Sequence, residues 1–163
     1  MISLTALFGA PAAAAEPDLL SLGIGWYDVN DDVNDDQDAA DFRIEYRPEW
    51  KFLWELKPWV GFEVTSDGAL YGAGGILLDV SLGRRLVLTP SFGVGLYGDG
   101  GGKDLGHTIE FRTQIELGYR LDEGARLGVA FGHISNANLS DVNPGTEVVA
   151  IYYHMPLGAL FGE

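Results

Sequence analysis

Three residues near the C-terminal end of the sequence have side chains that together could cleave an ester. His133 and Ser135 lie two positions apart, and Glu147 follows His133 by fourteen residues. In serine hydrolases a histidine takes the proton of a serine hydroxyl, while a carboxylate orients the imidazole. The sequence therefore contains the residue types for nucleophilic acyl transfer within one short stretch.

The spacing of these residues fits a β-hairpin. Residues two apart in a strand project from the same face, with Cα atoms about 6.6 Å apart at about 3.3 Å per residue. Residues directly opposite each other in an antiparallel pair have Cβ atoms about 4.5–5.5 Å apart. A hairpin with its loop at 138–146 would bring Glu147 beside the end of the preceding strand. Because most His-x-Ser pairs in strands have no catalytic role, the elements that position them must be considered.

Length and composition narrow the class of protein. The chain has 163 residues, the length of one domain, and its 23 glycines and 12% aromatic residues are typical of a β-rich protein with many turns. The net charge of −14 argues against a nucleic-acid partner, because no basic face is available to neutralise phosphates. The sequence has no cysteine, which excludes disulfides and thiolate metal sites.

The N-terminal segment has the features of an export signal. Residues 1–15 carry no charge and end in four alanines, so we expect a secretory signal peptide at 1–15 and a single domain at 16–163. An ordinary apolar strand or helix is the alternative, and the lack of Lys or Arg near Met1 leaves a start further upstream open. No uncharged apolar run reaches 18 residues, so the sequence predicts no transmembrane helix.

From Leu20 onward, large apolar residues recur at every second position, which is the period of a strand with one apolar face. The clearest segment is 109–121, where the alternate positions carry Glu110, Arg112 and Glu116. Eight strands of about ten residues match the strand length and the smallest even strand number of a transmembrane β-barrel. The expected strands are 20–27, 42–47, 54–64, 70–82, 86–96, 109–121, 127–135 and 147–157.

Periodicity alone does not say which face of these strands is inside. A soluble eight-stranded barrel would enclose its apolar face, but such a barrel has an interior only just wide enough for side chains. The apolar face here is the bulky one, and the other face is small or carries paired charges such as Arg43 and Glu45. We therefore predict an all-β fold, an eight-stranded antiparallel transmembrane β-barrel with its apolar face toward lipid.

The connections and the aromatic residues agree with this prediction. Outer-membrane barrels have short turns on the periplasmic side and longer loops outside, with aromatic girdles at both interfaces. Aromatic residues at expected strand ends are Trp26, Trp50, Trp54 and Tyr119. The expected short turns are 47–52, 83–85 and 122–125, and the opposite side has 30–38, 66–68, 98–106 and 138–146.

The three candidate residues then face lipid. His133, Ser135 and Glu147 have the parity of the apolar residues around them, such as Phe131 and Val149. A polar trio on the lipid face is energetically expensive unless it has a function. Because the last strand ends on the periplasmic side, the preceding loop is outside, and the substrate would be a lipid of the outer leaflet.

The segment 132–137, with Asn143-Pro144-Gly145 and Glu147, resembles the signature of the lipid A 3-O-deacylase (PagL-like) family of outer-membrane barrels. The motif covers the last two strands, and the rest of the chain agrees only in length and strand number. The resemblance implies an outer-membrane esterase that removes the 3-hydroxyacyl chain ester-linked at position 3 of lipid A in lipopolysaccharide. It also implies the roles, with no metal or cofactor: Ser135 as nucleophile, His133 as base, Glu147 as the orienting residue and Asn143 as oxyanion-hole candidate.

Other interpretations stay open at this point. A non-catalytic structural or adhesive barrel and a soluble lipocalin-like binder share the alternation, and a homodimer is compatible with the sequence. Six aspartates between Asp28 and Asp38 resemble the start of a calcium loop, but Val33 and Ala39 occupy the positions that require Gly and Glu. We expect a solvated loop there, with a secondary role in gathering divalent cations. His154 is expected to be a buried polar residue inside the barrel.

Overall fold

The expected strands are present in the computed structural model, which describes residues 17–29 and 39–161. The expected signal peptide at 1–15 lies outside the described residues. A 3-10 turn, η1 (Asp122–Gly124), precedes β8, and a helix, α1 (Leu157–Phe161), follows β9; within the described ranges no helix is long and apolar enough to cross a membrane. The strands are β1 (Leu19–Tyr27), β2 (Ala39–Arg47), β3 (Leu56–Thr65), β4 (Leu70–Leu78), β5 (Val80–Leu82), β6 (Leu86–Gly98), β7 (Ile109–Arg120), β8 (Arg126–Ser135) and β9 (Thr146–Pro156).

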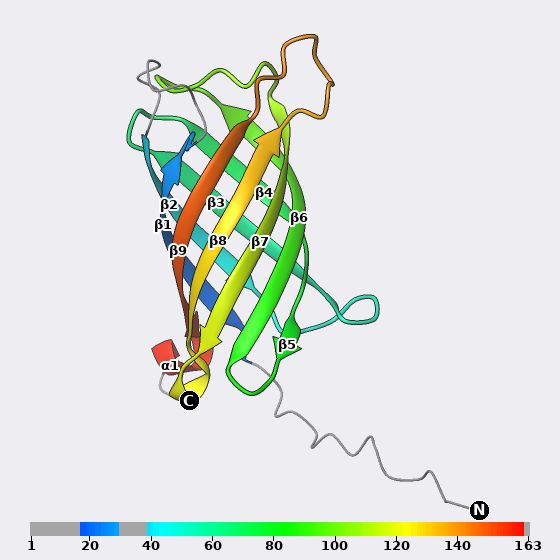
Figure 1. Cartoon of the computed structure of the whole chain (residues 1–163), viewed down its shortest axis with the longest axis vertical. Coiled ribbons are helices and arrows are strands. Elements are labelled where there is room, and N and C mark those ends of the chain that lie inside the picture. Colours follow the sequence, from blue (N-terminus) through cyan, green and yellow to red (C-terminus); the bar gives the residue numbers. More distant parts are fainter. Residues whose placement is uncertain (1–16, 30–38, 162–163) are drawn as a thin grey trace, which may run out of the picture.

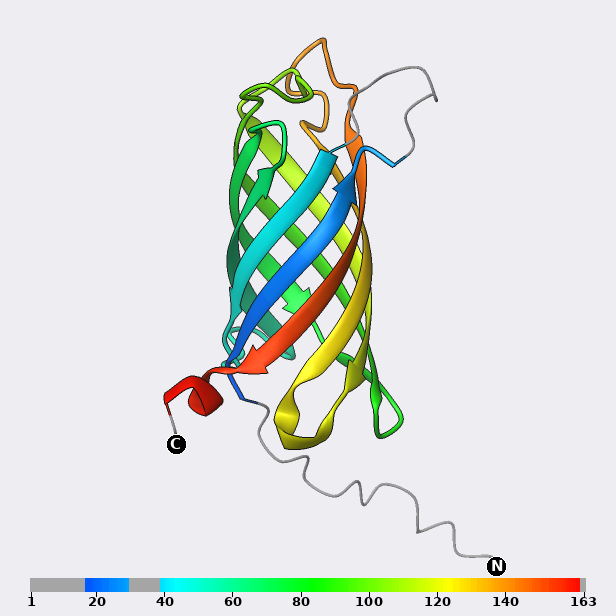
Figure 2. The same ribbon diagram turned by 90° about the vertical axis from the view of Figure 1, so that its left-hand side faces the viewer.

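These strands form one closed antiparallel barrel (Figures 1 and 2). Neighbouring strands pair in chain order, and β9 pairs with β1 to close the sheet. The short β5 continues β4 along β6, and the break at Asp79 lies opposite Thr89 and Pro90, where proline has no N–H to donate. In the described part of the chain, β4 and β5 thus act as one strand, and the predicted eight-stranded barrel is confirmed.

The apolar face of the strands lies outside the barrel and the charged face inside. Val129 on the outer wall is 57% exposed, whereas Glu116 in the lumen is 1% exposed. Alternate residues of every long strand follow the same rule. This arrangement is the reverse of a soluble barrel, so the lipocalin-like alternative is wrong. It is the arrangement that lipid outside and a narrow lumen inside require.

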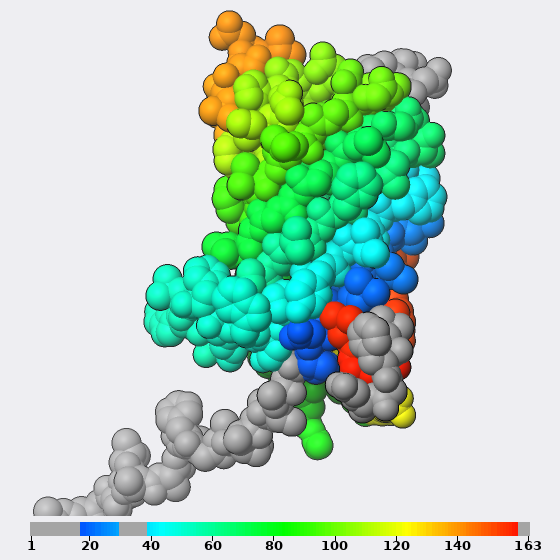
Figure 3. All heavy atoms as spheres, turned by 180° about the vertical axis from the view of Figure 1, so that it is seen from behind, coloured from blue at the N-terminus to red at the C-terminus, as the bar shows by residue number. Residues whose placement is uncertain are grey.

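Several strand ends differ from the expectation by one to three residues; for example, β2 begins at Ala39 instead of residue 42. Strand β3 begins at Leu56, so Trp54 and Glu55, expected in the strand, lie in a longer β2–β3 connection (48–55). There Glu55 pairs with Lys51 at 2.6 Å, and Trp54 is 91% exposed. This connection stands out from the wall in Figure 3. Strand β9 ends at Pro156, one residue earlier than expected, because α1 begins at Leu157.

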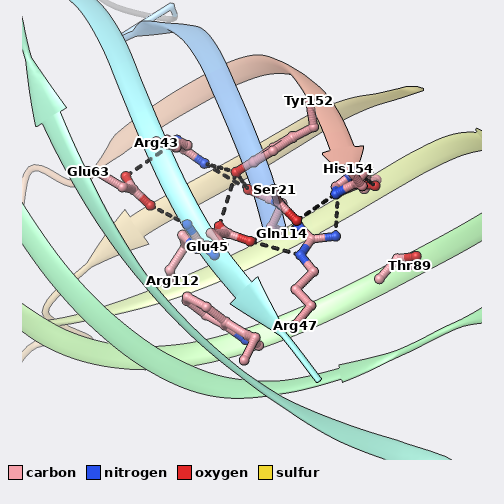
Figure 4. A network of polar contacts seen from close by, with 12 residues as sticks. Ser21, Arg43, Glu45, Arg47, Glu63, Thr89, Arg112, Gln114, Tyr152 and His154 are labelled. Atoms are coloured by element: carbon pink, nitrogen blue, oxygen red, sulfur yellow. Dashed lines mark hydrogen bonds and ion pairs between the residues drawn. The ribbon is translucent and has the colours of Figure 1, made fainter. Parts of the chain in front are cut away.

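The lumen is filled by a network of charged side chains from different strands (Figure 4). Arg112 of β7 forms ion pairs with Glu63 of β3 and, at 2.6 Å, with Glu45 of β2, and its guanidinium lies 4.0 Å from the Trp59 ring centre. Arg43 forms a second ion pair with Glu63, at 3.2 Å. Each of these four buried charges thus has an opposite charge beside it, which offsets the loss of hydration.

The network continues toward the end of the barrel where β1 begins and β9 ends. Arg47 bridges Glu45 at 2.8 Å and Glu116 at 3.0 Å. His154 lies between Ser21 Oγ, 2.7 Å from Nδ1, and Glu116 Oε1, 2.8 Å from Nε2. The expectation that His154 is a buried polar residue inside the barrel is confirmed.

Glycines on the inner face make room for the large aromatic side chains of the lumen. A Cβ on Gly95 would lie 2.7 Å from Tyr71 Cε2, and a Cβ on Gly93 would overlap the Trp59 ring. Both aromatic residues are buried. Small and large residues therefore alternate inside the barrel so that its narrow interior is filled.

Replacing Arg112 by methionine should lower the free energy of unfolding by about 3–5 kcal/mol, because Glu45 and Glu63 would each lose a buried partner. Urea unfolding of the protein in lipid vesicles measures the change. The matched control is Arg84→Met in the exposed β5–β6 turn, for which we expect a change within about 0.5 kcal/mol. Equal effects of the two substitutions would show that the network does not stabilise the barrel.

Candidate active site

Strands β8 and β9 place His133 and Glu147 directly opposite each other. His133 Nδ1 lies 3.0 Å from Glu147 Oε1. The two side chains are 43% and 28% exposed, and Phe131 and Val149, the next outward pair of the ladder, are exposed as well. The pair therefore lies on the outer wall, at the end of the barrel opposite the start of β1 and the end of β9, which we call the loop end (Figure 1).

Ser135 is the last residue of β8 and lies on the same face as His133. It is partly exposed and is paired with Phe111 across the β7–β8 ladder. Among the described residues no hydrogen bond joins Ser135 to His133. Catalytic hydrogen bonds are often long until a substrate is in place, so the lack of this bond does not exclude Ser135 as the nucleophile.

A tight turn follows Ser135 immediately. Leu139 N–H donates to Asn136 O at 3.0 Å, and the two residues between them have positive φ, +52° at Ala137 and +63° at Asn138. Asparagine adopts this left-handed conformation readily, but alanine does so at a cost of about 1–2 kcal/mol. Backbone strain of this kind is concentrated at functional sites.

Asn136 ties this turn to the rest of the loop end. Its side chain is fully buried, and Nδ2 donates to Leu105 O at 2.9 Å and Val142 O at 2.8 Å. Its backbone N–H donates to Asn143 Oδ1 at 3.0 Å, and Asn143 Nδ2 donates to Asn138 Oδ1 at 3.2 Å. Asn143, the oxyanion-hole candidate, is therefore held beside the turn that follows Ser135, with one of its two amide hydrogens engaged.

Strand β1 and the β6–β7 connection hold the start of β9. Glu147 O accepts hydrogen bonds from the N–H groups of Asp28 at 2.8 Å and Val29 at 3.1 Å. The Asp28 carboxylate accepts from Thr146 Oγ1 at 3.1 Å and from Lys103 Nζ at 2.8 Å. Asp28 is buried, so the expected solvated loop is wrong for this residue. The other five aspartates of that run lie outside the described residues.

Gly145 lets the backbone pass close to the imidazole. A Cβ at this position would lie 2.9 Å from His133 Cε1, and the backbone φ of +65° is one that glycine adopts without strain. The loop can therefore close against the face of the ring. Any larger residue here would displace either the loop or His133.

The sequence reasoning missed most of the residues that support the site. Asn136 stood within the motif but received no role, and Asp28 was assigned to a solvated loop. The Asp28–Thr146 contact joins residues 118 positions apart, and no local pattern predicts such a pair. Within the described ranges no group of three His, Cys, Asp or Glu residues could hold a metal ion.

An apolar groove lies on the outer wall beside the site. Its volume is about 320 Å³, and it reaches Phe131 and Val149, which adjoin His133 and Glu147 along their strands. The site is thus open sideways, toward the apolar surroundings of the wall. The groove is lined mainly by Leu88, Ile115, Leu117, Val129, Phe131 and Val149.

The family model and the most similar relatives described here all indicate one family. The model of the family "Lipid A 3-O-deacylase (PagL)" matches residues 39–156. The lipid A deacylase PagL of Bordetella bronchiseptica is 35% identical over 51 residues, 31% of this chain and 29% of the relative. That of Pseudomonas aeruginosa is 33% identical over 57 residues, 35% of this chain and 33% of the relative. These alignments thus span about a third of the length of either relative.

A solved structure shows the same fold. The crystal structure of the outer membrane enzyme PagL superimposes with a TM-score of 0.65 at 21% sequence identity. The superposition covers 85% of this chain and 99% of that chain. The barrel described above is therefore the fold of an outer-membrane enzyme over nearly all of that enzyme's length.

Replacing Asn136 by alanine should lower the free energy of unfolding by about 1–3 kcal/mol, because the carbonyl oxygens of Leu105 and Val142 would lose their donor and the first of them is buried. Hydrogen exchange should also become faster in the 136–145 loop. Asn138→Gly is the matched control: glycine keeps the left-handed backbone, and only the exposed hydrogen bond from Asn143 is lost, so the change in stability should be about 0.5 kcal/mol or less. If Asn136→Ala and Asn138→Gly have the same free energy of unfolding and the same hydrogen exchange in the loop, Asn136 does not anchor the loop.

Proposed function

Because the chain belongs to the lipid A 3-O-deacylase (PagL) family, we propose that it is an outer-membrane esterase that removes the 3-hydroxyacyl chain ester-linked at position 3 of lipid A. The observation that carries this proposal is the hydrogen-bonded pair of His133 and Glu147, with Nδ1 and Oε1 3.0 Å apart. Ser135 lies two residues further along the same outward face. The three residues are of the types that a serine esterase uses, and the contact between the histidine and the carboxylate is present.

Each of the three residues has one task in the proposed reaction. With Nδ1–H donated to Glu147, the Nε2 of His133 is free to accept a proton. Ser135 Oγ attacks the ester carbonyl carbon as its proton passes to Nε2, and the sugar oxygen then leaves as an alcohol with that proton. Water, activated by His133 in the same way, attacks the acyl-enzyme, releases the 3-hydroxy fatty acid and restores Ser135.

Asn143 is the proposed donor to the oxyanion of the tetrahedral intermediates. One hydrogen of its amide group is engaged by Asn138, and the other would point at the developing negative charge. A donor of this kind contributes about 3–4 kcal/mol to transition-state stabilisation in comparable acyl-transfer sites. The bond from Asn136 N–H to Asn143 Oδ1 orients the amide for this role.

The position of the site supports a lipid substrate. The pair of His133 and Glu147 lies on the outer wall at the loop end, where we place the outer leaflet and its lipid A. The apolar groove beside Phe131 and Val149 would receive an acyl chain while the polar head of the substrate stays at the rim. A soluble ester would gain nothing from a site that opens sideways into lipid.

Replacing Ser135 by alanine should abolish deacylation, because no nucleophile would remain. Mass spectrometry of lipid A from cells that express the protein measures this directly. With the natural sequence, we expect the loss of one hydroxyacyl group, and with Ser135→Ala we expect unchanged lipid A. Ser140→Ala, in the loop before β9, is the control and should keep the activity.

Unchanged lipid A with the natural sequence, from cells in which the barrel is folded in the outer membrane, would contradict the proposed esterase. It would favour the non-catalytic barrel instead. Deacylation by the Ser135→Ala variant would support the deacylase activity but would show that Ser135 is not the nucleophile.

Replacing Glu147 by glutamine should lower the deacylation rate about 10²–10⁴-fold, because the side chain keeps its shape but no longer holds His133 in the reactive tautomer or stabilises the imidazolium. The rate is measured on lipid A in detergent. Labelling of Ser135 by a fluorophosphonate should fall in parallel, and circular dichroism should be unchanged. A rate equal to that of the natural sequence would exclude Glu147 from the catalytic group.

A further inference from the structure

The exposed cations of this chain are gathered at one end of the barrel. All ten Lys and Arg residues lie within the described ranges, and five of them are buried. Lys103 is paired with Asp28 at the loop end. The remaining four lie at the end where β1 begins and β9 ends, which we call the termini end. Three of them, Arg84, Arg85 and Arg120, form a cluster that we call the basic rim.

The basic rim is built by two neighbouring turns, β5–β6 and β7–β8, which lie at the termini end in both ribbon views (Figures 1 and 2). Arg120 N–H donates to Arg85 O at 2.7 Å, and Arg85 Nη1 donates to Arg120 O at 3.2 Å. Arg120 Nη2 donates to Ser81 Oγ at 3.1 Å. These bonds to the main chain and to Ser81 hold the guanidinium groups of Arg85 and Arg120, which line the same hollow, before any ligand binds.

The cluster lines a polar hollow of about 510 Å³, together with Leu121 and Asp122. Asp122 Oδ1 lies 2.9 Å from Arg85 Nη1, but both side chains are well exposed. An ion pair in that setting contributes little to stability. An anion that accepts two hydrogen bonds from the Arg85 guanidinium can therefore replace Asp122. With three cations and one carboxylate in its lining, the hollow has a net positive charge.

The hollow lies where the apolar wall of the barrel ends. Leu82, Leu86 and Tyr119 are exposed on the outer face next to it, and the Arg85 guanidinium lies 6.0 Å from the Tyr119 ring centre. An arginine and a tyrosine at the edge of an apolar belt mark the level of the lipid headgroups. A phospholipid at this point would place its acyl chains on the leucines and its phosphate in the hollow.

The two ends of the barrel differ in where cations cluster. At the loop end the exposed charged side chains include Asp99, Asp104 and Asp141, which repel anions, whereas at the other end the three arginines of the basic rim lie beside Asp122 and Glu123. We propose that the basic rim binds the phosphate headgroup of an anionic glycerophospholipid in the leaflet at the termini end. The planar guanidinium fork matches two phosphate oxygens at once, and arginines near an anionic lipid surface are attracted to it.

The test is native mass spectrometry of the full chain in a zwitterionic detergent, titrated with phosphatidylglycerol or with phosphatidylcholine of the same acyl chains. We expect preferential binding of phosphatidylglycerol and an affinity about thirtyfold lower for the double variant Arg84→Gln/Arg85→Gln. Lys51→Gln is the matched control, because Lys51 is an exposed cation at the same end but lies in the β2–β3 connection and pairs with Glu55. It should keep the natural affinity.

Equal binding of the two lipids, or equal losses in the double variant and in Lys51→Gln, would overturn the proposal. Displacement of phosphatidylglycerol by inorganic phosphate at the same concentration would show a site for the free anion and would also overturn it. Circular dichroism confirms that the variants are folded. Lipid A deacylation by the double variant should be unchanged, because the basic rim lies at the opposite end of the barrel from His133, so this test is independent of the proposed function.

Discussion

The closure of the sheet between β1 and β9 is the constraint on which the rest of this structure depends. In lipid no water is available to satisfy an open strand edge, so every backbone group in the wall needs a partner on a neighbouring strand. Closure with eight strands then leaves a lumen just wide enough for side chains. The large apolar residues must point outward, and the charged residues must fill the lumen in neutralised groups around Arg112, Arg43 and Arg47.

Against this background, His133 and Glu147 are exceptions on the outer wall. Their polar side chains lie in the apolar face of β8 and β9, at the point where the ladder ends and the loops begin. They do not rely on the lumen network. The backbone of Glu147 is held by β1 through Asp28, and the turn after Ser135 is held by the buried side chain of Asn136. The site is thus positioned by the same closure that joins β1 to β9.

The two ends of the barrel are built for different surroundings. The loop end has acidic loops and the candidate site, whereas the termini end has two short turns, the β2–β3 connection with its exposed aromatic residues, and the basic rim. Deviations from the expected strands also occur at the termini end, in the β2–β3 connection and at Asp79. There local turn geometry and the missing N–H of Pro90, rather than the alternation of side chains, decide where pairing stops.

The sequence alone determined the features that repeat along the chain. Alternation at every second residue predicted eight strands, because neighbouring side chains of a strand point to opposite sides. The bulk of the apolar face predicted that this face points outward, because the interior of an eight-stranded barrel is narrow. The short interval between His133 and Glu147 predicted that one hairpin would bring them together. Only the tertiary structure decided the partners of Arg112 in the lumen, the Asp28–Thr146 contact behind the site and the joining of Arg85 to Arg120. These contacts link residues 35 to 118 positions apart, and they exist because the closed barrel brings distant strands to one place.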